Sequence, residues 1–314
     1  MEDERANALA WVVEKSGVEE WGRGWLVTDG THIKLVWKPA LHAREHFSYQ
    51  GNYLFNVSLV FLPHSLHIVK SIIGHPGSSH DSCVWASGDN GIVAKPCLHL
   101  DEGEFVWVDA GFGFSAFSVG SFNNNTASKS HDIQYFNYFL SHIWIHAEHG
   151  IAYLKNHFQC LMGYCGNLYH EEDHERAAYT IQACIVAHTF ASQYDHPDDV
   201  ADYLLQSFSE EDLADVTSGL PLYHQATEEA RIMQQDNQAQ YEQVIADATQ
   251  GMSQNQMNKF HADWALDLRE EMFSALFVAN GRPFEDTTAK SRRKAMTTVA
   301  YNKHQGWQSR QTES

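Results

Sequence analysis

Three acidic residues are the side chains of this sequence best suited to chemistry: Asp29, Asp109 and Glu148. Asp29 lies within WLVTDGTHI and Asp109 within EFVWVDAGF, so each follows a short apolar run that is typical of a buried strand. Glu148 opens EHGIAYLKNHFQCL, whose apolar residues recur at helical spacing. Carboxylates at the ends of two core strands and on a helix flank can converge on one rim of a sheet, where divalent metal would neutralise them. That chemistry suits the hydrolysis of phosphodiesters.

Size and composition indicate a globular protein. With 314 residues and 43% hydrophobic content, the chain can bury a substantial core in one large or two smaller domains. It has no apolar stretch of about eighteen residues, and its first residues, MEDERANALAWVV, begin with acids, so we expect neither a membrane span nor a secretion signal. The five cysteines are scattered without a CxxC pair, which favours a reducing compartment and argues against structural zinc.

The charge balance is unusual for a protein that binds nucleic acid. The net charge is −19, and the segment 195–258 carries thirteen acids against one base, Arg231. Because Lys and Arg contacts to phosphates dominate the affinity of proteins for DNA, this balance predicts weak, salt-sensitive DNA binding by the isolated chain.

The order of expected elements predicts an α/β fold with an RNase H-like mixed sheet flanked by helices. A helix and lead-in occupy residues 1–22, and the RNase H-like domain spans 23–195. An acidic C-terminal extension, partly helical or disordered, covers 196–314. Within the domain we expect strands at 25–28, 53–62, 66–73 and 105–108, a short helix near 81–87, and helices from about 143 and over 175–191.

Five segments, taken in order, resemble successive blocks of the PIF/Harbinger transposase family, whose domain is the DDE superfamily endonuclease domain. They are WLVTDGTHI, FSYQGNYLFNVSLVF, GHPGSSHDSCVW, EFVWVDAGF and FNYFLSHIWIHAEHGIAYLKNHFQCL, and the resemblance covers roughly residues 11–191. It implies an RNase H-like fold, a catalytic and metal-binding triad of Asp29, Asp109 and Glu148, and two Mg²⁺ or Mn²⁺ ions. Such enzymes cut DNA at element ends and join the freed 3′ hydroxyl to a target.

Candidate DNA contacts are few. Lys155 lies seven residues after Glu148 on the same helical side, Lys34 follows the first catalytic strand, and His149 either contacts phosphate or faces solvent. Relatives tend to carry basic residues just before the catalytic glutamate, where this chain has Trp-Ile-His-Ala. The resemblance therefore implies DNA as the substrate and a separate Myb/SANT-like DNA-binding partner protein. The sequence also allows an oligomer.

Several interpretations stay open at this stage. The His80-Asp81-Ser82 run either supplies a further metal ligand or caps a helix. The basic cluster at 290–294 is compatible with nuclear import, which predicts a nuclear protein, or with a phosphate patch. Three functions are compatible with the sequence. The chain is a metal-dependent transposase-type nuclease, at full or weakened activity, or a non-enzymatic DNA-associated or protein-interaction factor on the same fold, or a decaying copy that folds poorly.

Overall fold

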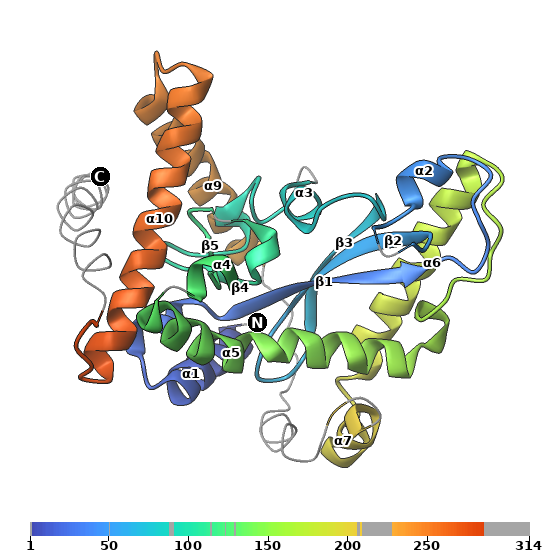
Figure 1. Ribbon diagram of the computed structural model, residues 1–314, viewed down its shortest axis with the longest axis horizontal. Coiled ribbons are helices and arrows are strands. Elements are labelled where there is room, and N and C mark those ends of the chain that lie inside the picture. Colours follow the sequence, from blue (N-terminus) through green and yellow to red (C-terminus); the bar gives the residue numbers. More distant parts are fainter. Residues whose placement is uncertain are drawn as a thin grey trace.

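A five-stranded mixed sheet forms the centre of the molecule, with strand order β3-β2-β1-β4-β5 (Figure 1). The computed structural model describes residues 2–49, 51–87, 91–113, 115–122, 124–128, 130–205, 208 and 228–285. The central strand β1 pairs antiparallel with β2 and parallel with β4. This topology confirms the predicted α/β class and is consistent with an RNase H-like fold. The strands are β1 Leu26–Lys34, β2 Leu54–Phe61, β3 Ile68–Pro76, β4 Val106–Val108 and β5 Ser118–Gly120.

The apolar runs of the sequence became strands because the sheet is covered on both faces. All eight residues of β2 are buried, as expected of a strand inside a two-sided core. On one face, Val27 and Leu59 belong to a core shared with the long helix α5, His131–His157. On the other face, Leu26 and Val106 pack with the short helix α3, Asp81–Ala86. Alternate residues of β1 therefore face different layers.

Helix α5 begins well before the position expected from sequence. It starts at His131 rather than near 143, and the hydroxyl of Ser130 caps it by accepting from the Ile133 N–H at 3.2 Å. The helix lies very close to the sheet at Gly150, where a Cβ would lie 2.5 Å from Cε1 of Phe61. Glycine at that position lets the helix axis approach β2.

The two ends of the described chain meet in the core. Helix α1, Glu2–Ser16, leads into the 3-10 turn η1, Glu19–Arg23, where the indole Nε1 of Trp21 donates to the carbonyl of Met272 at 2.8 Å. Met272 lies in helix α10, Gln254–Ala279, which contributes five buried side chains to the main core, and these are Met272, Phe273, Ala275, Leu276 and Phe277. The expected acidic extension is thus helical in its described part, but α10 is not peripheral.

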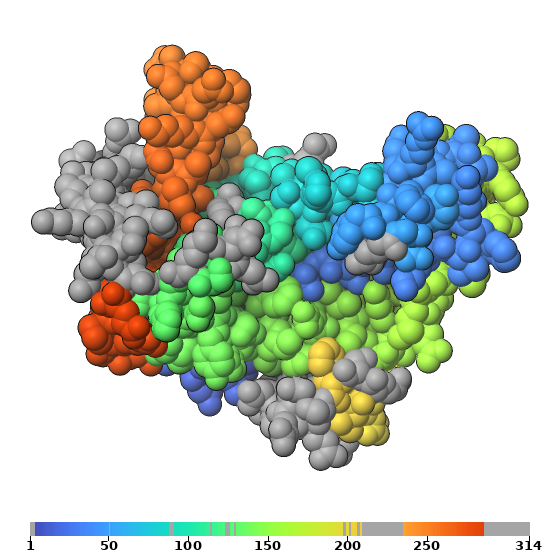
Figure 2. Space-filling model, in the orientation of Figure 1, coloured from blue at the N-terminus to red at the C-terminus, as the bar shows by residue number. Residues whose placement is uncertain are grey.

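The remaining elements surround this core. Helix α6, Glu171–Ala191, packs beside β3, and the end of α9, Glu228–Thr249, rises with the first half of α10 as a narrow projection (Figure 2). Within the described residues, no helix is long and apolar enough to cross a membrane. The shorter elements are α2 Ala43–His46, α4 Asn124–Ala127, α7 Pro197–Leu205, η2 Pro96–Leu98, η3 Ala110–Phe112 and η4 Gln159–Leu161.

Candidate active site

Strands β1 and β4 bring Asp29 and Asp109 to the same level of the sheet. The two strands run parallel with Val27 paired to Trp107, and each aspartate follows two residues later. Side chains two residues apart share a face, and neighbouring strands lie about 4.8 Å apart, so the two carboxylates are neighbours. Asp29 was expected at the end of its strand. It is instead the fourth residue of nine in β1, and it is the pairing with β4 that ends before it.

Hydrogen bonds orient both aspartates. A carboxylate oxygen of Asp29 accepts from the backbone N–H of Gly30 at 2.7 Å. Asp109 is the N-cap of η3, and its carboxylate accepts from the Gly111 N–H at 3.5 Å and from the Ser121 hydroxyl at 3.4 Å. These few contacts leave carboxylate lone pairs available to another ligand.

Helix α5 is fixed along β1 at two points on either side of Glu148. The indole of Trp144 donates to the Thr28 carbonyl at 3.0 Å, and the ammonium of Lys155 donates to the His32 carbonyl at 3.0 Å. The helix advances about 1.5 Å per residue and the strand about 3.3 Å, so the two elements stay roughly in step between these anchors. Glu148 shares their helix face and comes one turn after Trp144. It therefore lies beside Asp29.

The electrostatics agree with this placement. Burial, together with the negative charges of Glu148, Asp109 and Asp81, raises the pKa of Asp29 to about 8 against the opposing Gly30 hydrogen bond. Burial likewise raises the pKa of Glu148, with an added contribution from the charge of Asp109. The three residues named in the sequence analysis thus repel one another across a shared, partly buried space.

A fourth carboxylate, Asp81, adjoins the same space from the opposite face of the sheet. A Cβ at Gly30 would lie 3.0 Å from its Oδ1, and a Cβ at Gly111 would lie 3.7 Å from its Oδ2. The helix-cap interpretation of Asp81 is wrong, because His80 is the N-cap of α3 and makes no side-chain cap bond. Asp81 instead accepts from Nδ2 of Asn56 at 2.9 Å.

The residue set fits hard divalent cations. Among the described residues, no three His, Cys, Asp or Glu side chains are already drawn together closely enough to hold a metal ion. The group nevertheless consists entirely of carboxylates, the donors that Mg²⁺ and Mn²⁺ prefer, and its mutual repulsion is what a bound cation relieves.

Of the expected DNA contacts, the two lysines remain possible phosphate contacts, whereas His149 is buried. Lys34 is exposed at the end of β1, whereas Lys155 is partly buried, and burial together with the charge of Lys34 lowers its pKa to about 8. His149 is only 1% exposed, with its ring 4.3 Å from that of Phe208. The expectation that His149 contacts phosphate does not fit this structure. The basic cluster at 290–294 lies outside the described residues.

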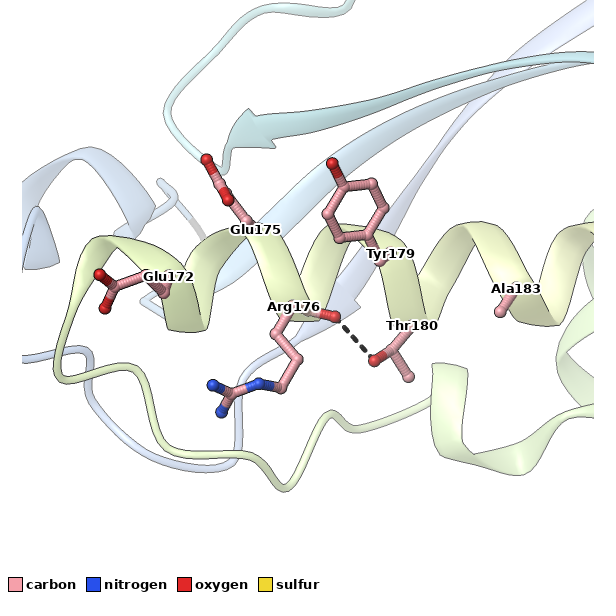
Figure 3. Close-up of a pocket in the computed structure, with 6 residues that line it drawn as sticks. All are labelled: Glu172, Glu175, Arg176, Tyr179, Thr180 and Ala183. Carbon is pink, nitrogen blue, oxygen red and sulfur yellow. Dashed lines mark hydrogen bonds between the residues drawn. The ribbon is translucent and has the colours of Figure 1, made fainter.

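A shallow hollow along α6 is separate from the acidic group (Figure 3). Its floor is the helix itself, where the Thr180 hydroxyl donates to the Arg176 carbonyl at 2.7 Å. Its lining residues are Glu172, Glu175, Arg176, Tyr179, Thr180 and Ala183. None of the four carboxylates belongs to it.

Comparison with known proteins identifies one family. A family model described as DDE superfamily endonuclease matches residues 28–188, just over half of the chain. The matched range includes all four carboxylates of the site and ends within α6. No curated protein and no solved structure matches the chain significantly.

Proposed function

The chain belongs to the DDE superfamily endonuclease family, and we propose that it is a divalent-metal-dependent DNA nuclease of the PIF/Harbinger transposase type. The observation that supports this most is the juxtaposition of Asp29, Asp109 and Glu148 by two parallel strands and an anchored helix. Three carboxylates on separate elements have no structural reason to face one another, because their repulsion costs stability.

Each of the three acidic residues would hold the cations from a different element of the fold. Asp29 and Asp109 come from adjacent strands and would hold cations between them, while Glu148 would close the site from α5. Bound Mg²⁺ or Mn²⁺ would supply activation of the attacking oxygen and stabilisation of the leaving oxygen at the scissile phosphate. The raised pKa of Asp29 means that its carboxyl holds a proton at neutral pH unless a cation is present.

DNA is the substrate that follows from this proposal. Lys34 and Lys155 would contact backbone phosphates beside the site, and Lys155 already lies on the helix face of Glu148. With a net charge of −19, the chain would need a basic partner, of the Myb/SANT-like kind, to reach DNA at physiological salt. Strand transfer and nuclear location are parts of the same proposal.

A nicking assay on supercoiled plasmid tests the proposal. Purified protein at low salt should nick DNA with Mn²⁺ or Mg²⁺ and not with EDTA, and Asp109→Asn should abolish nicking. Asp236→Asn, which neutralises an exposed acid of α9, is the matched control and should nick like the wild type. Metal-independent nicking, or equal nicking by Asp109→Asn, would show that the activity does not arise at this site.

The strongly negative charge favours one alternative, a non-enzymatic DNA-associated or protein-interaction factor on the same fold. Folded wild-type protein that binds a partner but does not nick DNA with either metal would support that alternative and overturn the nuclease.

A further inference from the structure

Asp81 occupies a position that its local sequence does not explain. It is the first residue of α3, a helix of six residues, and it is partly buried. Its side chain does not cap the helix, and among the described residues it forms no ion pair with Lys or Arg. A carboxylate on a short helix would ordinarily face solvent, so its position over the sheet requires a specific cause.

That cause is a combination of one hydrogen bond and two glycines. Nδ2 of Asn56, which is 1% exposed in β2, donates both to Asp81 at 2.9 Å and to the Ser79 carbonyl at 3.0 Å. Both acceptors belong to the segment that leads into α3. Asn56 thereby ties the start of that helix to the sheet, and its own Oδ1 has no hydrogen-bond partner in the structure.

Glycines 30 and 111 provide the room that the Asp81 carboxylate uses. At Gly30 a Cβ would lie 3.0 Å from Oδ1 of Asp81, a contact that would force the carboxylate to move. At Gly111 a Cβ would lie 3.7 Å from Oδ2 of Asp81 and 3.7 Å from Oδ2 of Asp109. The distance between Oδ2 of Asp81 and Oδ2 of Asp109 is therefore at most twice 3.7 Å, and Gly111 places no side chain between these two oxygens.

We propose that Asp81 is a fourth carboxylate of the DDE site, held by Asn56 and exposed to Asp109 by Gly30 and Gly111, and that it takes part in binding the divalent cation. The geometry supports this, because Asp29 and Glu148 lie on the α5 side of the sheet and Asp81 on the α3 side, both next to the part of β1 that follows its last pair with β4. Asp81 would hold the cation together with the triad. The inference rests on the proposed metal-dependent function and extends it to a residue outside the triad.

Metal affinity measured without DNA tests this inference. Mn²⁺ would be titrated into the full chain and the free ion followed by electron paramagnetic resonance, for wild type, Asp81→Asn and the exposed-acid control Asp236→Asn. We expect Asp81→Asn to raise the Kd for Mn²⁺ by about 10- to 100-fold, the loss that follows removal of a group supporting a metal site. Asp236→Asn should bind like the wild type.

A second variant tests the position of the Asp81 carboxylate without changing any charge. Gly30→Ala keeps every charge but places a methyl group against Oδ1 of Asp81, so it should also weaken Mn²⁺ binding. Circular dichroism would confirm that each variant is folded. Mn²⁺ affinity of Asp81→Asn within twofold of the wild type overturns the inference, as does a wild type that binds no Mn²⁺. Plasmid nicking is scored separately, so a wild type that binds Mn²⁺ through Asp81 without cutting DNA would refute only the proposed nuclease.

Discussion

Replacing Asp29 by Asn should stabilise the metal-free protein, and more so as the pH rises. The pKa of Asp29 is raised to about 8 in the folded chain, against about 3.9 for an aspartate in an unfolded chain. Between these values the folded state holds a proton that the unfolded state has released. The wild type therefore loses stability as the pH rises from about 4 to about 8, and above that the loss is complete.

The expected loss of wild-type stability is large relative to the total stability of a protein domain. Each pH unit in this window costs about 1.4 kcal/mol, so the wild type loses up to about 4 kcal/mol between pH 5 and pH 8. Asp29 is partly exposed, and water at the carboxylate reduces this figure, so we expect about 2 to 4 kcal/mol. Asparagine at this position does not titrate and keeps nearly the same volume, so the variant escapes that loss.

Urea denaturation in EDTA at pH 5, 6.5, 8 and 9 would measure this difference. The free energy of unfolding of Asp29→Asn minus that of the wild type should rise with pH up to about 8 and then level off. Added Mn²⁺ should raise the free energy of unfolding of the wild type far more than that of the variant. Asp236→Asn should show no such trend, because its carboxylate is exposed. A difference between Asp29→Asn and wild type that does not change from pH 5 to pH 9 would refute the reasoning.

Two further predictions concern packing and charge. Gly150→Ala should destabilise the protein by about 1 to 3 kcal/mol despite the better helix propensity of alanine, because its Cβ would lie 2.5 Å from Phe61. Gly163→Ala should be nearly neutral, because its Cβ would lie 3.5 Å from the nearest atom. Thermal unfolding compares the two variants, and equal Tm values would contradict the close approach of α5 to the sheet. The pKa of Lys155 is lowered to about 8, so this lysine loses its charge between pH 7 and pH 9.5. If Lys155 contacts a DNA phosphate, the slope of log K for DNA binding against log salt concentration should become shallower by about 0.9 over that range in the wild type but not in Lys155→Met. An unchanged wild-type slope would show that Lys155 does not contact DNA.

The elements that carry the three acidic residues of the predicted site could be predicted from the sequence because their signals are local. Apolar runs before Asp29 and Asp109 became paired parallel strands, and the helical repeat after Glu148 became the second half of α5. Asp81 was ambiguous because its partner, Asn56, lies 25 residues earlier on another strand, and no spacing rule links the two. His149 was expected to contact phosphate or to face solvent, and it does neither, because it is buried beside His146 and Phe208.

Short and polar elements were the least predictable part of the fold. Strand β5 has three residues, too few to show an alternating pattern, and it forms only because β4 offers a parallel edge. Helix α10 was placed in a peripheral extension because its composition is rich in polar residues on average. Its buried residues run from Ala265 to Phe277, where the packing of η1 and α5 selects one face.

The hydrogen bond between Trp21 and Met272 joins residues 251 positions apart in the chain, and this separation affects how the protein is made. During synthesis Trp21 of η1 and Phe136 of α5 can pack against each other, but their contacts with α10 form only after residue 277 has left the ribosome. Closing so long a loop adds only a modest entropic cost, but it delays completion of the core and lengthens the time in which apolar surface is exposed. The apolar surface that α10 covers should therefore stay exposed until this helix docks.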